Sequence, residues 1–411
     1  MDELDHKILG KSLDLFTFSD TVGKGLPLWT PKGSVIRREL ERFIVDEEIK
    51  RGYLHVYTPD IAKLELYKKS GHYPYYKTDM YAPIKIEDEK FMLRPMSCPH
   101  HFELFLSKPR SYRELPMRIA ELAKLYRFEQ SGELMGLQRV RSFCLSDAHI
   151  ICTKQQVKDE IRGVLDLIKF VSKTLGFKQG ENYHFRLSLG DRTDNNKKYY
   201  KDDKAWDHAE GVLRDSLKDN GLEFVEAAKE AAFYGPKIDI QMKNANGKED
   251  TIITVQYDFV MPKRFKLTYI TEKGETKEPV VIHRSSIGTV ERIIAFLIEF
   301  YKGAFPLWLS PVQVKVLPIT DKQTKYSEEV TKRLSELSIR TELDGRNETL
   351  QAKIRDASLE KVPYMIVIGE REQVNGKISV RTRDGENKNG INLQDFIDEL
   401  KAACETRQIS I

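Results

Sequence analysis

The sequence has few cysteines and no long apolar run. Its 4 cysteines among 411 residues form no short-spaced pair, so they indicate neither a disulfide framework nor a zinc ribbon. The longest apolar run, around residues 293–298, falls far short of the roughly 18 residues that a membrane helix needs. The acidic start, Met1-Asp-Glu-Leu, lacks the apolar core of a secretory signal. We therefore expect a soluble cytoplasmic protein that has no membrane partner.

A large charge of one sign is also missing. The 67 Lys and Arg residues nearly balance the 63 Asp and Glu residues, which leaves a net charge of +4. Spread over 411 residues, this charge gives no argument for a nucleic-acid partner. Any binding of a polyanion must therefore depend on local patches of basic residues.

The length and a change in composition predict two domains. A chain of 411 residues corresponds to two or three domains of ordinary size. The segment 303–311 contains Pro306 and Pro311 and has the character of a domain boundary. Beyond it, short apolar runs alternate with helical patterns, which favours a compact α/β domain with a mostly parallel sheet. We expect the domains to span residues 1–308 and 309–411.

Two helical patterns and one charged segment lie before this boundary. Apolar residues at helical spacing predict an amphipathic helix over residues 154–175. The same spacing from residue 34 to 44 predicts another helix, with Ser34 as its N-cap and Gly52 as its stop. The highly charged stretch 191–220 is most simply interpreted as a solvated insertion.

An antiparallel hairpin is predicted for residues 119–129 and 138–151, on either side of a loop that contains two glycines. If its second strand is unbroken, one face of that strand carries Arg139, Arg141, Asp147 and His149. Guanidinium groups on such a face suit a phosphorylated ligand. A second interpretation is that these residues are solvent-exposed charges on an antiparallel sheet. The residues alone favour this second interpretation.

Nine sequence motifs, one of them in two parts, together resemble one enzyme family. Three of them resemble motifs 1, 2 and 3 of class II aminoacyl-tRNA synthetases: Gly52-Tyr53 through Pro59, Leu125-Tyr-Arg-Phe-Glu129 with Arg139-Val-Arg-Ser-Phe143, and Gly288-Thr-Val-Glu-Arg292. The other six closely resemble the bacterial-type threonyl-tRNA synthetase family: Arg94-Pro-Met-Ser-Cys-Pro-His-His101, Leu137-Gln-Arg-Val-Arg141, Ser146-Asp-Ala-His-Ile150, Phe233-Tyr-Gly-Pro-Lys-Ile238, Val255-Gln-Tyr-Asp-Phe259 and Val281-Ile-His-Arg284. The resemblance implies an α+β catalytic domain, with the class II antiparallel sheet flanked by helices, and a smaller α/β anticodon-binding domain.

The resemblance also implies an activity. A threonine-tRNA ligase joins threonine to ATP as threonyl-adenylate, releases pyrophosphate, and transfers threonine to the 3′-terminal adenosine of tRNA(Thr). The family's ATP-binding positions correspond here to Arg127, Glu129, Arg139 and Arg292. Mg²⁺ is expected with the ATP, because cations and positive side chains neutralise charge at the transferring phosphorus.

A zinc ion is implied at three positions that lie far apart in the sequence. The family binds one Zn²⁺ per chain with one cysteine and two histidines, which correspond to Cys98, His149 and His283. Their spacing alone gives no evidence for a metal, because a lone cysteine is most often a small buried apolar residue. Three protein ligands would leave zinc open to the amino and hydroxyl groups of threonine. Valine lacks the hydroxyl and would be rejected, whereas serine lacks only a methyl group and would be rejected weakly.

Further positions follow from the same resemblance. It assigns threonine binding to Met96, Asp147, Tyr234 and Gln256, and the transfer step to His72 and Lys237. Since an ordinary histidine titrates near neutrality, we expect His72 to relay a proton. A histidine that merely caps a turn is the alternative for this position.

The remaining implications concern tRNA and a second copy of the chain. Glu372 and Arg381 correspond to the family's anticodon-reading positions, and a homodimer is expected through the motif 1 region. Many relatives carry N-terminal domains, one of which hydrolyses mischarged seryl-tRNA. These domains have no counterpart in the 411 residues, so we expect seryl-tRNA to be formed and not cleared. Two alternatives stay open: a synthetase-like paralogue that binds tRNA or senses amino acids without charging, and another class II ligase such as the prolyl enzyme.

Overall fold

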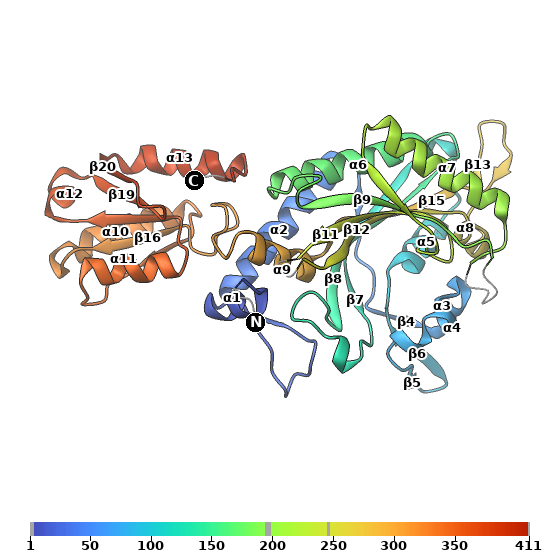
Figure 1. Cartoon of the computed structure of the whole chain (residues 1–411), viewed down its shortest axis with the longest axis horizontal. Coiled ribbons are helices and arrows are strands. Elements are labelled where there is room, and N and C mark those ends of the chain that lie inside the picture. Colours follow the sequence, from blue (N-terminus) through green and yellow to red (C-terminus); the bar gives the residue numbers. More distant parts are fainter. Residues whose placement is uncertain (1–3, 194–198, 245–246, 410–411) are drawn as a thin grey trace. The chain divides into compact units, whose positions relative to one another are not determined.

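The chain forms two compact units in a computed structural model that describes residues 4–193, 199–244 and 247–409 (Figure 1). The larger unit comprises residues 18–27 and 41–295. The smaller unit comprises the described residues of 1–17, 28–40 and 296–411. Within the described part of the chain, no helix combines the length and the apolar character required to cross a membrane.

An eight-stranded sheet organises the larger unit. Its strands follow the spatial order β10 (Phe224–Ala227), β9 (Tyr183–Ser188), β11 (Lys237–Lys243), β12 (Glu249–Asp258), β15 (Val280–Thr289), β8 (Ser142–Cys152), β7 (Met117–Tyr126) and β3 (Leu54–His55). All neighbours are antiparallel except the two outermost pairs, β10 with β9 and β3 with β7. The expected antiparallel class II sheet is therefore confirmed. Its central strands β12, β15 and β8 carry five of the residues discussed below: Gln256, Asp258, His283, Asp147 and His149.

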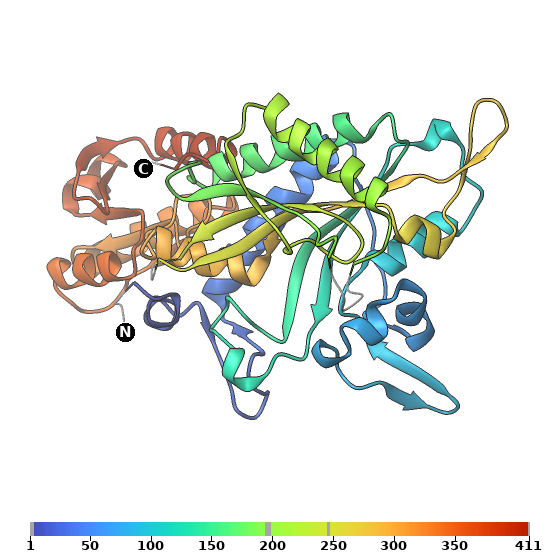
Figure 2. The ribbon, with the colours of Figure 1, turned by 45° about the vertical axis from the view of Figure 1, so that its right-hand side comes forward.

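Two helices, α6 (Val157–Thr174) and α7 (Asp203–Asp219), run side by side over one face of this sheet (Figures 1 and 2). The amphipathic pattern predicted α6, and its apolar residues Ile161, Leu165 and Ile168 are fully buried. The solvated insertion expected over residues 191–220 is wrong for the part that forms α7. Trp206, Ala209, Leu213 and Leu217 of α7 are buried at helical spacing, and the charged residues between them obscured this pattern in the sequence. Residues 194–198 lie outside the described residues.

The hairpin is shorter than predicted. β7 ends at Tyr126 and β8 begins at Ser142, and residues 127–141 form a connection that contains a short 3₁₀ turn. Arg139 pairs with Met135 inside this connection, so Arg139 and Arg141 do not continue the face of β8. The pairing between β7 and β8 stops at Tyr126 and Ser142. The alternating pattern in the sequence continues beyond these residues, so the predicted strands were too long at the loop end.

Helix α2 (Pro31–Lys50) begins earlier than the predicted cap at Ser34. Pro31 occupies the first helical position, where the missing N–H costs nothing. The Thr30 hydroxyl accepts a hydrogen bond from the Gly33 backbone N–H at 3.2 Å and caps the helix instead. The predicted stop is correct: α2 ends at Lys50, just before Gly52, which adopts a positive φ of 79°.

The smaller unit contains a five-stranded sheet of mixed direction. Its elements in chain order are β16 (Val314–Pro318), α10 (Thr324–Glu336), β17 (Thr341–Leu343), α11 (Leu350–Leu359), β18 (Tyr364–Ile368), α12 (Glu370–Asn375), β19 (Ile378–Thr382), β20 (Asn387–Ile391) and α13 (Leu393–Glu405). The strand order is β17-β16-β18-β19-β20, with parallel pairs up to β18 and antiparallel pairs beyond it. The prediction of a mostly parallel sheet came from the alternation of short apolar runs with helical patterns. This prediction is wrong for β19 and β20, which pair in antiparallel fashion.

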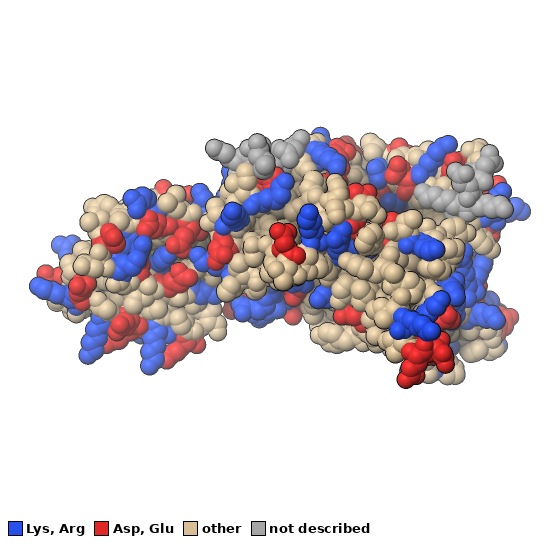
Figure 3. All heavy atoms as spheres, turned by 90° about the horizontal axis from the view of Figure 1, so that it is seen from below, with Lys and Arg blue, Asp and Glu red and all other residues tan. Residues whose placement is uncertain are grey.

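Positive and negative side chains are interspersed over much of the face drawn in Figure 3. On this face, local groups of either sign lie close to one another rather than in two oppositely charged regions. The sites that follow depend on such local groups.

Candidate functional site

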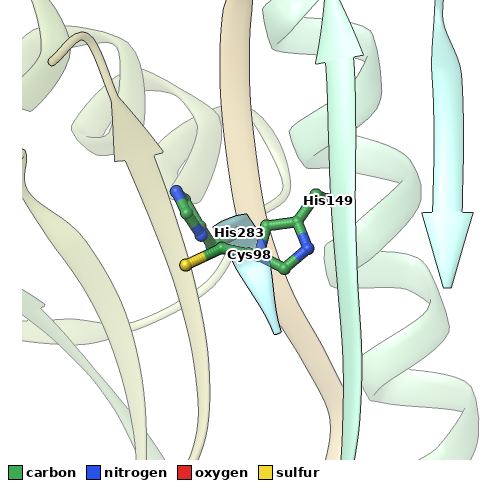
Figure 4. A group of neighbouring side chains, drawn as sticks. All are labelled: Cys98, His149 and His283. Carbon is green, nitrogen blue, oxygen red and sulfur yellow. The ribbon is translucent and has the colours of Figure 1, made fainter. Parts of the chain in front are cut away.

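Cys98, His149 and His283 lie together in the larger unit, although they are far apart in the sequence. Cys98 is the first residue of α5 (Cys98–Leu106), while His149 and His283 are directly paired across β8 and β15. Their potential ligand atoms all lie within 4.8 Å of one another, and the three side chains point toward one another (Figure 4). All three residues are buried. The sheet register and the start of α5 therefore bring together a compact group of side chains that could hold a metal ion.

The donor chemistry of this triad fits a zinc ion. One thiol and two imidazoles are ligands that Zn²⁺ prefers, and three protein ligands leave it an open position. Burial raises the pKa of the Cys98 thiol, and the carboxyl groups of Asp147 and Asp258 raise it further. Burial also lowers the pKa of His149, which keeps its imidazole neutral and able to coordinate. Each histidine engages one ring nitrogen in a hydrogen bond and leaves the other for a ligand.

A cavity of about 300 Å³ opens beside the triad. Of the residues expected from the sequence, it is lined by Met96, Cys98, Arg127, Glu129, Arg139, Asp147, His149, Tyr234, Gln256, His283 and Arg292. The structure thus brings all the expected metal, ATP and threonine positions to one cavity. Such a cavity has room for a small ligand and combines carboxylate, amide, phenol and guanidinium groups.

Around the triad, the expected threonine-binding residues are held by short polar contacts. The Ser97 hydroxyl donates a hydrogen bond to Asp147 Oδ2, and the Tyr234 hydroxyl donates one to Gln256 Oε1. Burial raises the pKa of Asp147, and the hydrogen bond from Ser97 opposes that effect. A cationic ligand beside Asp147 would stabilise its ionised form against the effect of burial. Sequence reasoning missed Ser97, although it lies beside Cys98 in a quoted motif.

The three arginines on the cavity wall are held in different ways. Arg292 donates to the backbone oxygens of Gln138 and Thr251 at 2.9 and 2.8 Å, and burial lowers its pKa. The guanidinium carbon of Arg127 lies 5.2 Å from the centre of the Phe143 ring. Arg139 is half exposed and forms an ion pair with Glu129 at 2.7 Å. Glu129 is therefore bound to the guanidinium group of Arg139, and an anionic ligand could take its place there.

His72 and Lys237 line a second cavity of about 360 Å³, which shares Met96, Arg127, Tyr234 and Gln256 with the first. His72 Nδ1 lies 2.7 Å from the Ser70 hydroxyl, whereas its buried Nε2 has no hydrogen-bond partner among the described residues. Burial lowers the pKa of His72 to about 3, so the expected pKa near neutrality is wrong. His72 is a neutral hydrogen-bonding group at pH 7.

Lys237 reaches the same cavity from β11. Its ammonium group forms an ion pair with the fully buried Asp239 at 3.0 Å. Asp239 also accepts a hydrogen bond from the Ser188 hydroxyl at 2.7 Å. These contacts fix the position of the Lys237 side chain at the cavity wall.

Glu372 and Arg381 belong to the smaller unit and are not among the residues that line the two cavities. Glu372 accepts hydrogen bonds from the Gly369 backbone N–H at 3.0 Å and from the Ser379 hydroxyl at 2.8 Å. Burial opposes ionisation of Glu372, but these hydrogen bonds outweigh it and lower the pKa. Because Ser379 and Arg381 are two positions apart on β19, Arg381 emerges on the face that carries Glu372.

The fold and these sites define a class of protein. Residues 76–301 match the family described as "tRNA synthetase class II core domain (G, H, P, S and T)", and residues 313–403 match "Anticodon binding domain". The chain belongs to the class II tRNA synthetases.

Two relatives with high sequence identity are named threonine-tRNA ligases. A threonine-tRNA ligase of Geobacillus sp. (strain WCH70) is 50% identical over 401 residues, which are 97% of this chain and 62% of that protein. The threonine-tRNA ligase of Staphylococcus aureus (strain JH9) is 48% identical over 400 residues, 97% of this chain and 61% of that protein. The chain therefore spans about three fifths of the length of the curated relatives it matches.

Two solved structures share the fold. One, described as the RNA-binding domain of threonyl-tRNA synthetase from Cryptosporidium parvum Iowa II, has a TM-score of 0.90 and 36% identity. The match covers 97% of this chain and 98% of that one. The other, a putative threonyl-tRNA synthetase of Aeropyrum pernix, has a TM-score of 0.86 and 30% identity, over 98% and 95% of the two chains.

Proposed function

We propose that this chain is a threonine-tRNA ligase, which makes threonyl-adenylate from threonine and ATP and then transfers threonine to tRNA(Thr). One observation carries the proposal. The cavity beside Cys98, His149 and His283 is also lined by Arg127, Arg139 and Arg292, so a metal site for an amino acid and a cationic site for ATP share one space. The threonine-tRNA ligase relatives support the same conclusion.

Threonine recognition is assigned to the triad and the residues around it. When bound, one Zn²⁺ per chain supplies coordination positions for the amino and hydroxyl groups of threonine. Asp147 accepts hydrogen bonds from those groups, and the Tyr234–Gln256 pair and Met96 border the remaining part of the pocket. A site that must satisfy a hydroxyl group disfavours valine, whose methyl group leaves these polar partners unfilled.

In the activation step, a threonine carboxylate oxygen attacks the α-phosphorus of ATP while the bond to pyrophosphate breaks. Arg127, Arg139 and Arg292, together with Mg²⁺ carried by ATP, neutralise the charge on the phosphates and hold the two reactants in line. Glu129 is released from Arg139 when phosphate binds and is free to contact the adenosine part of ATP. The residues thus position the reactants and stabilise charge without forming a covalent intermediate.

The transfer step is assigned to the second cavity. Lys237 contributes positive charge beside the activated carboxyl group, and Asp239 fixes its position. The unpartnered Nε2 of His72 accepts a hydrogen bond from a ribose hydroxyl of the terminal adenosine. Because His72 is neutral, it orients that hydroxyl. As the ribose oxygen bonds to the threonyl carbonyl carbon, the acyl–phosphate bond breaks, AMP leaves, and the phosphate group accepts the proton.

We place the catalytic domain at residues 1–308 and the anticodon-binding domain at 309–411. Glu372 and Arg381 share a face of the smaller unit and can contact the edges and faces of unstacked anticodon bases. As an enzyme of translation, the protein is expected to act in the cytoplasm.

A homodimer through the motif 1 region is part of the proposal. Among the residues that the structure describes, β3 is the outermost strand beside β7, so one of its backbone edges has no partner strand in the sheet. Leu54 of β3 is 57% exposed, and Tyr57 just after it is 96% exposed. Large apolar side chains beside a free strand edge suit contact with the same surface of a second copy.

Amino-acid-dependent exchange of pyrophosphate into ATP tests the proposed activity. Exchange that depends on threonine, and not on proline, is the expected result. Equal exchange with proline would assign the chain to another class II ligase, and no exchange with threonine would favour a non-charging paralogue. Charging of tRNA(Thr) in the same preparation tests the second step.

A further inference from the structure

A second layer of buried polar residues lies behind the metal triad. It consists of Glu121 and His101 behind His149, and of Asp258 behind His283. His101 is fully buried, and Glu121 and Asp258 are 3% and 0% exposed. None of the three is among the residues that line the two cavities, so we look for their role in their contacts with the two histidines.

Asp258 determines which nitrogen of His283 carries a proton. Its Oδ1 accepts hydrogen bonds from the backbone N–H groups of Val260 and Met261 at 2.8 and 2.9 Å. Its Oδ2 lies 2.7 Å from His283 Nε2. An ionised carboxylate only accepts hydrogen bonds, so Nε2 of His283 is the donor and Nδ1 keeps its lone pair. That lone pair is the one available to a metal.

Glu121 is held in its ionised form by several donors. Arg94 Nη1, the Thr58 backbone N–H and the Thr58 hydroxyl lie 3.1, 3.1 and 2.8 Å from its oxygens. Burial opposes ionisation, but hydrogen bonds from His101 and Thr58 and the charge of Arg94 outweigh it and lower the pKa of Glu121 to about 2. His101 Nε2 lies 3.1 Å from Glu121 and must donate to this carboxylate.

The hydrogen bond of His101 with Glu121 also determines how His101 binds to His149. The two Nδ1 atoms lie 2.7 Å apart, so one of them donates and the other accepts. When the proton on Nε2 that His101 donates to Glu121 is the single N–H proton of the ring, Nδ1 accepts, and His149 donates from its own Nδ1. The lone pair of His149 then lies on Nε2, the nitrogen that faces Asp147 of the cavity wall at 4.0 Å. The opposite arrangement would put a proton on the nitrogen that has to bind the metal.

We propose that the Glu121–His101 pair and Asp258 preset the tautomers of His149 and His283, so that each ring directs a lone pair to the metal before it binds. His101 is thus a positioning residue for the metal centre. The inference rests on the zinc ion of the proposed function, but the tautomer it assigns exists without the metal. Groups in this layer commonly change metal affinity by about 10–100-fold.

Three variants of neighbouring histidines test the proposal. In His101→Leu no acceptor faces His149, whereas in His101→Asn the side-chain oxygen stands near the position of Nδ1 and can accept. The control is His100→Leu, because His100 is buried beside His101 and neither of its ring nitrogens has a hydrogen-bond partner among the described residues. Thermal unfolding of each variant verifies that it is folded.

Two readouts are needed on these proteins. Long-range ¹H–¹⁵N spectra of the metal-free, histidine-labelled chain report the His149 tautomer, and competition with a chelator reports the zinc dissociation constant. We expect His149 to be protonated at Nδ1 in the unaltered chain, in His101→Asn and in His100→Leu. We expect His101→Leu to mix the two tautomers and to bind zinc about 10–100-fold more weakly.

The outcomes separate this inference from the proposed function. If the unaltered chain binds no zinc, the metal part of the proposed function is wrong, and the metal-free tautomer of His149 still decides the inference. An unaltered His149 tautomer together with unaltered zinc affinity in His101→Leu would overturn the inference. If His101→Leu does not fold, Asp258→Asn gives the same test at His283, where the expected loss in affinity is again about 10–100-fold.

Discussion

His149 and His283 are direct partners across β8 and β15, and their imidazole centroids lie 4.6 Å apart with the ring planes at 87°. Residues paired across neighbouring strands are held at a separation that the sheet itself sets. Two potential metal ligands are thus placed by two paired strands inside the eight-stranded sheet. Cys98 completes the group from the first turn of α5, which packs on the same sheet.

Zinc content should depend on Cys98. We expect about one Zn²⁺ per chain in the unaltered protein and a loss of zinc, together with threonine activation, in Cys98→Ala, because two imidazoles alone hold the ion weakly. Cys152→Ala is the matched control, since Cys152 is also a fully buried free cysteine but lies outside the triad. Elemental analysis of both variants provides the measurement, and full zinc occupancy in Cys98→Ala would contradict the assignment.

Arg139→Ala should slow adenylate formation with little effect on stability. The Arg139 side chain is 45% exposed, and its ion pairs are with Glu129 and Glu133, so its removal should change the free energy of unfolding by less than about 1 kcal/mol. The lost charge at the phosphates should lower kcat for pyrophosphate exchange by about 10²–10³-fold. Arg162→Ala, on the exposed side of α6, is the control. A rate within twofold of the unaltered chain would remove Arg139 from the ATP site.

A charge at the edge of β3 should separate the proposed dimer. Leu54→Glu would bury an unpaired carboxylate against the second copy, and a cost of about 3 kcal/mol weakens association by roughly a hundredfold. Val374→Glu places the same charge on an exposed residue of α12 and should leave association unchanged. Sedimentation equilibrium compares the two variants. A monomeric unaltered chain, or equal association of both variants, would exclude this surface as the interface.

Glu121 should contribute to stability against acid. Its pKa falls from the ordinary value of 4.5 to about 2 in the folded chain, so between these pH values the unfolded chain binds the extra proton. The contribution is complete above about pH 4.5 and is lost as the pH falls toward 2, at no more than about 1.4 kcal/mol per pH unit. In urea unfolding of the metal-free protein, the stability difference between the unaltered chain and Glu121→Gln should therefore shrink over this range. A difference independent of pH would refute the shift.

Local patterns predicted much of the scaffold. Apolar spacing located α6, because Ile161 and Leu165 repeat on one buried face with few charges between them. The same reasoning failed for α7, where charged residues separate Trp206 from Leu213. The sequence pattern also predicted that β8 begins at Gln138. Alternation of residue types does not show where two strands cease to pair, and β8 begins to pair with β7 only at Ser142.

The site depended on the family resemblance more than on pattern. No spacing rule joins Cys98 to His149 and His283, because their contact is created by strand register and by the placement of α5. The neutral state of His72 was not predictable either, since it follows from complete burial. His101 and Asp258 lie within the quoted motifs, but only the hydrogen-bond distances reveal that they support the ligands.

Pyrophosphate exchange with threonine, serine and valine, measured on the zinc-loaded chain, tests the central claim most directly. The account predicts the highest kcat/KM for threonine. It predicts a value roughly 10–200-fold lower for serine, which lacks one methyl group, and only background exchange for valine, which lacks the hydroxyl. Exchange with valine at a rate comparable to that with threonine would show that the pocket beside Cys98, His149 and His283 does not recognise the hydroxyl group, and would contradict the account.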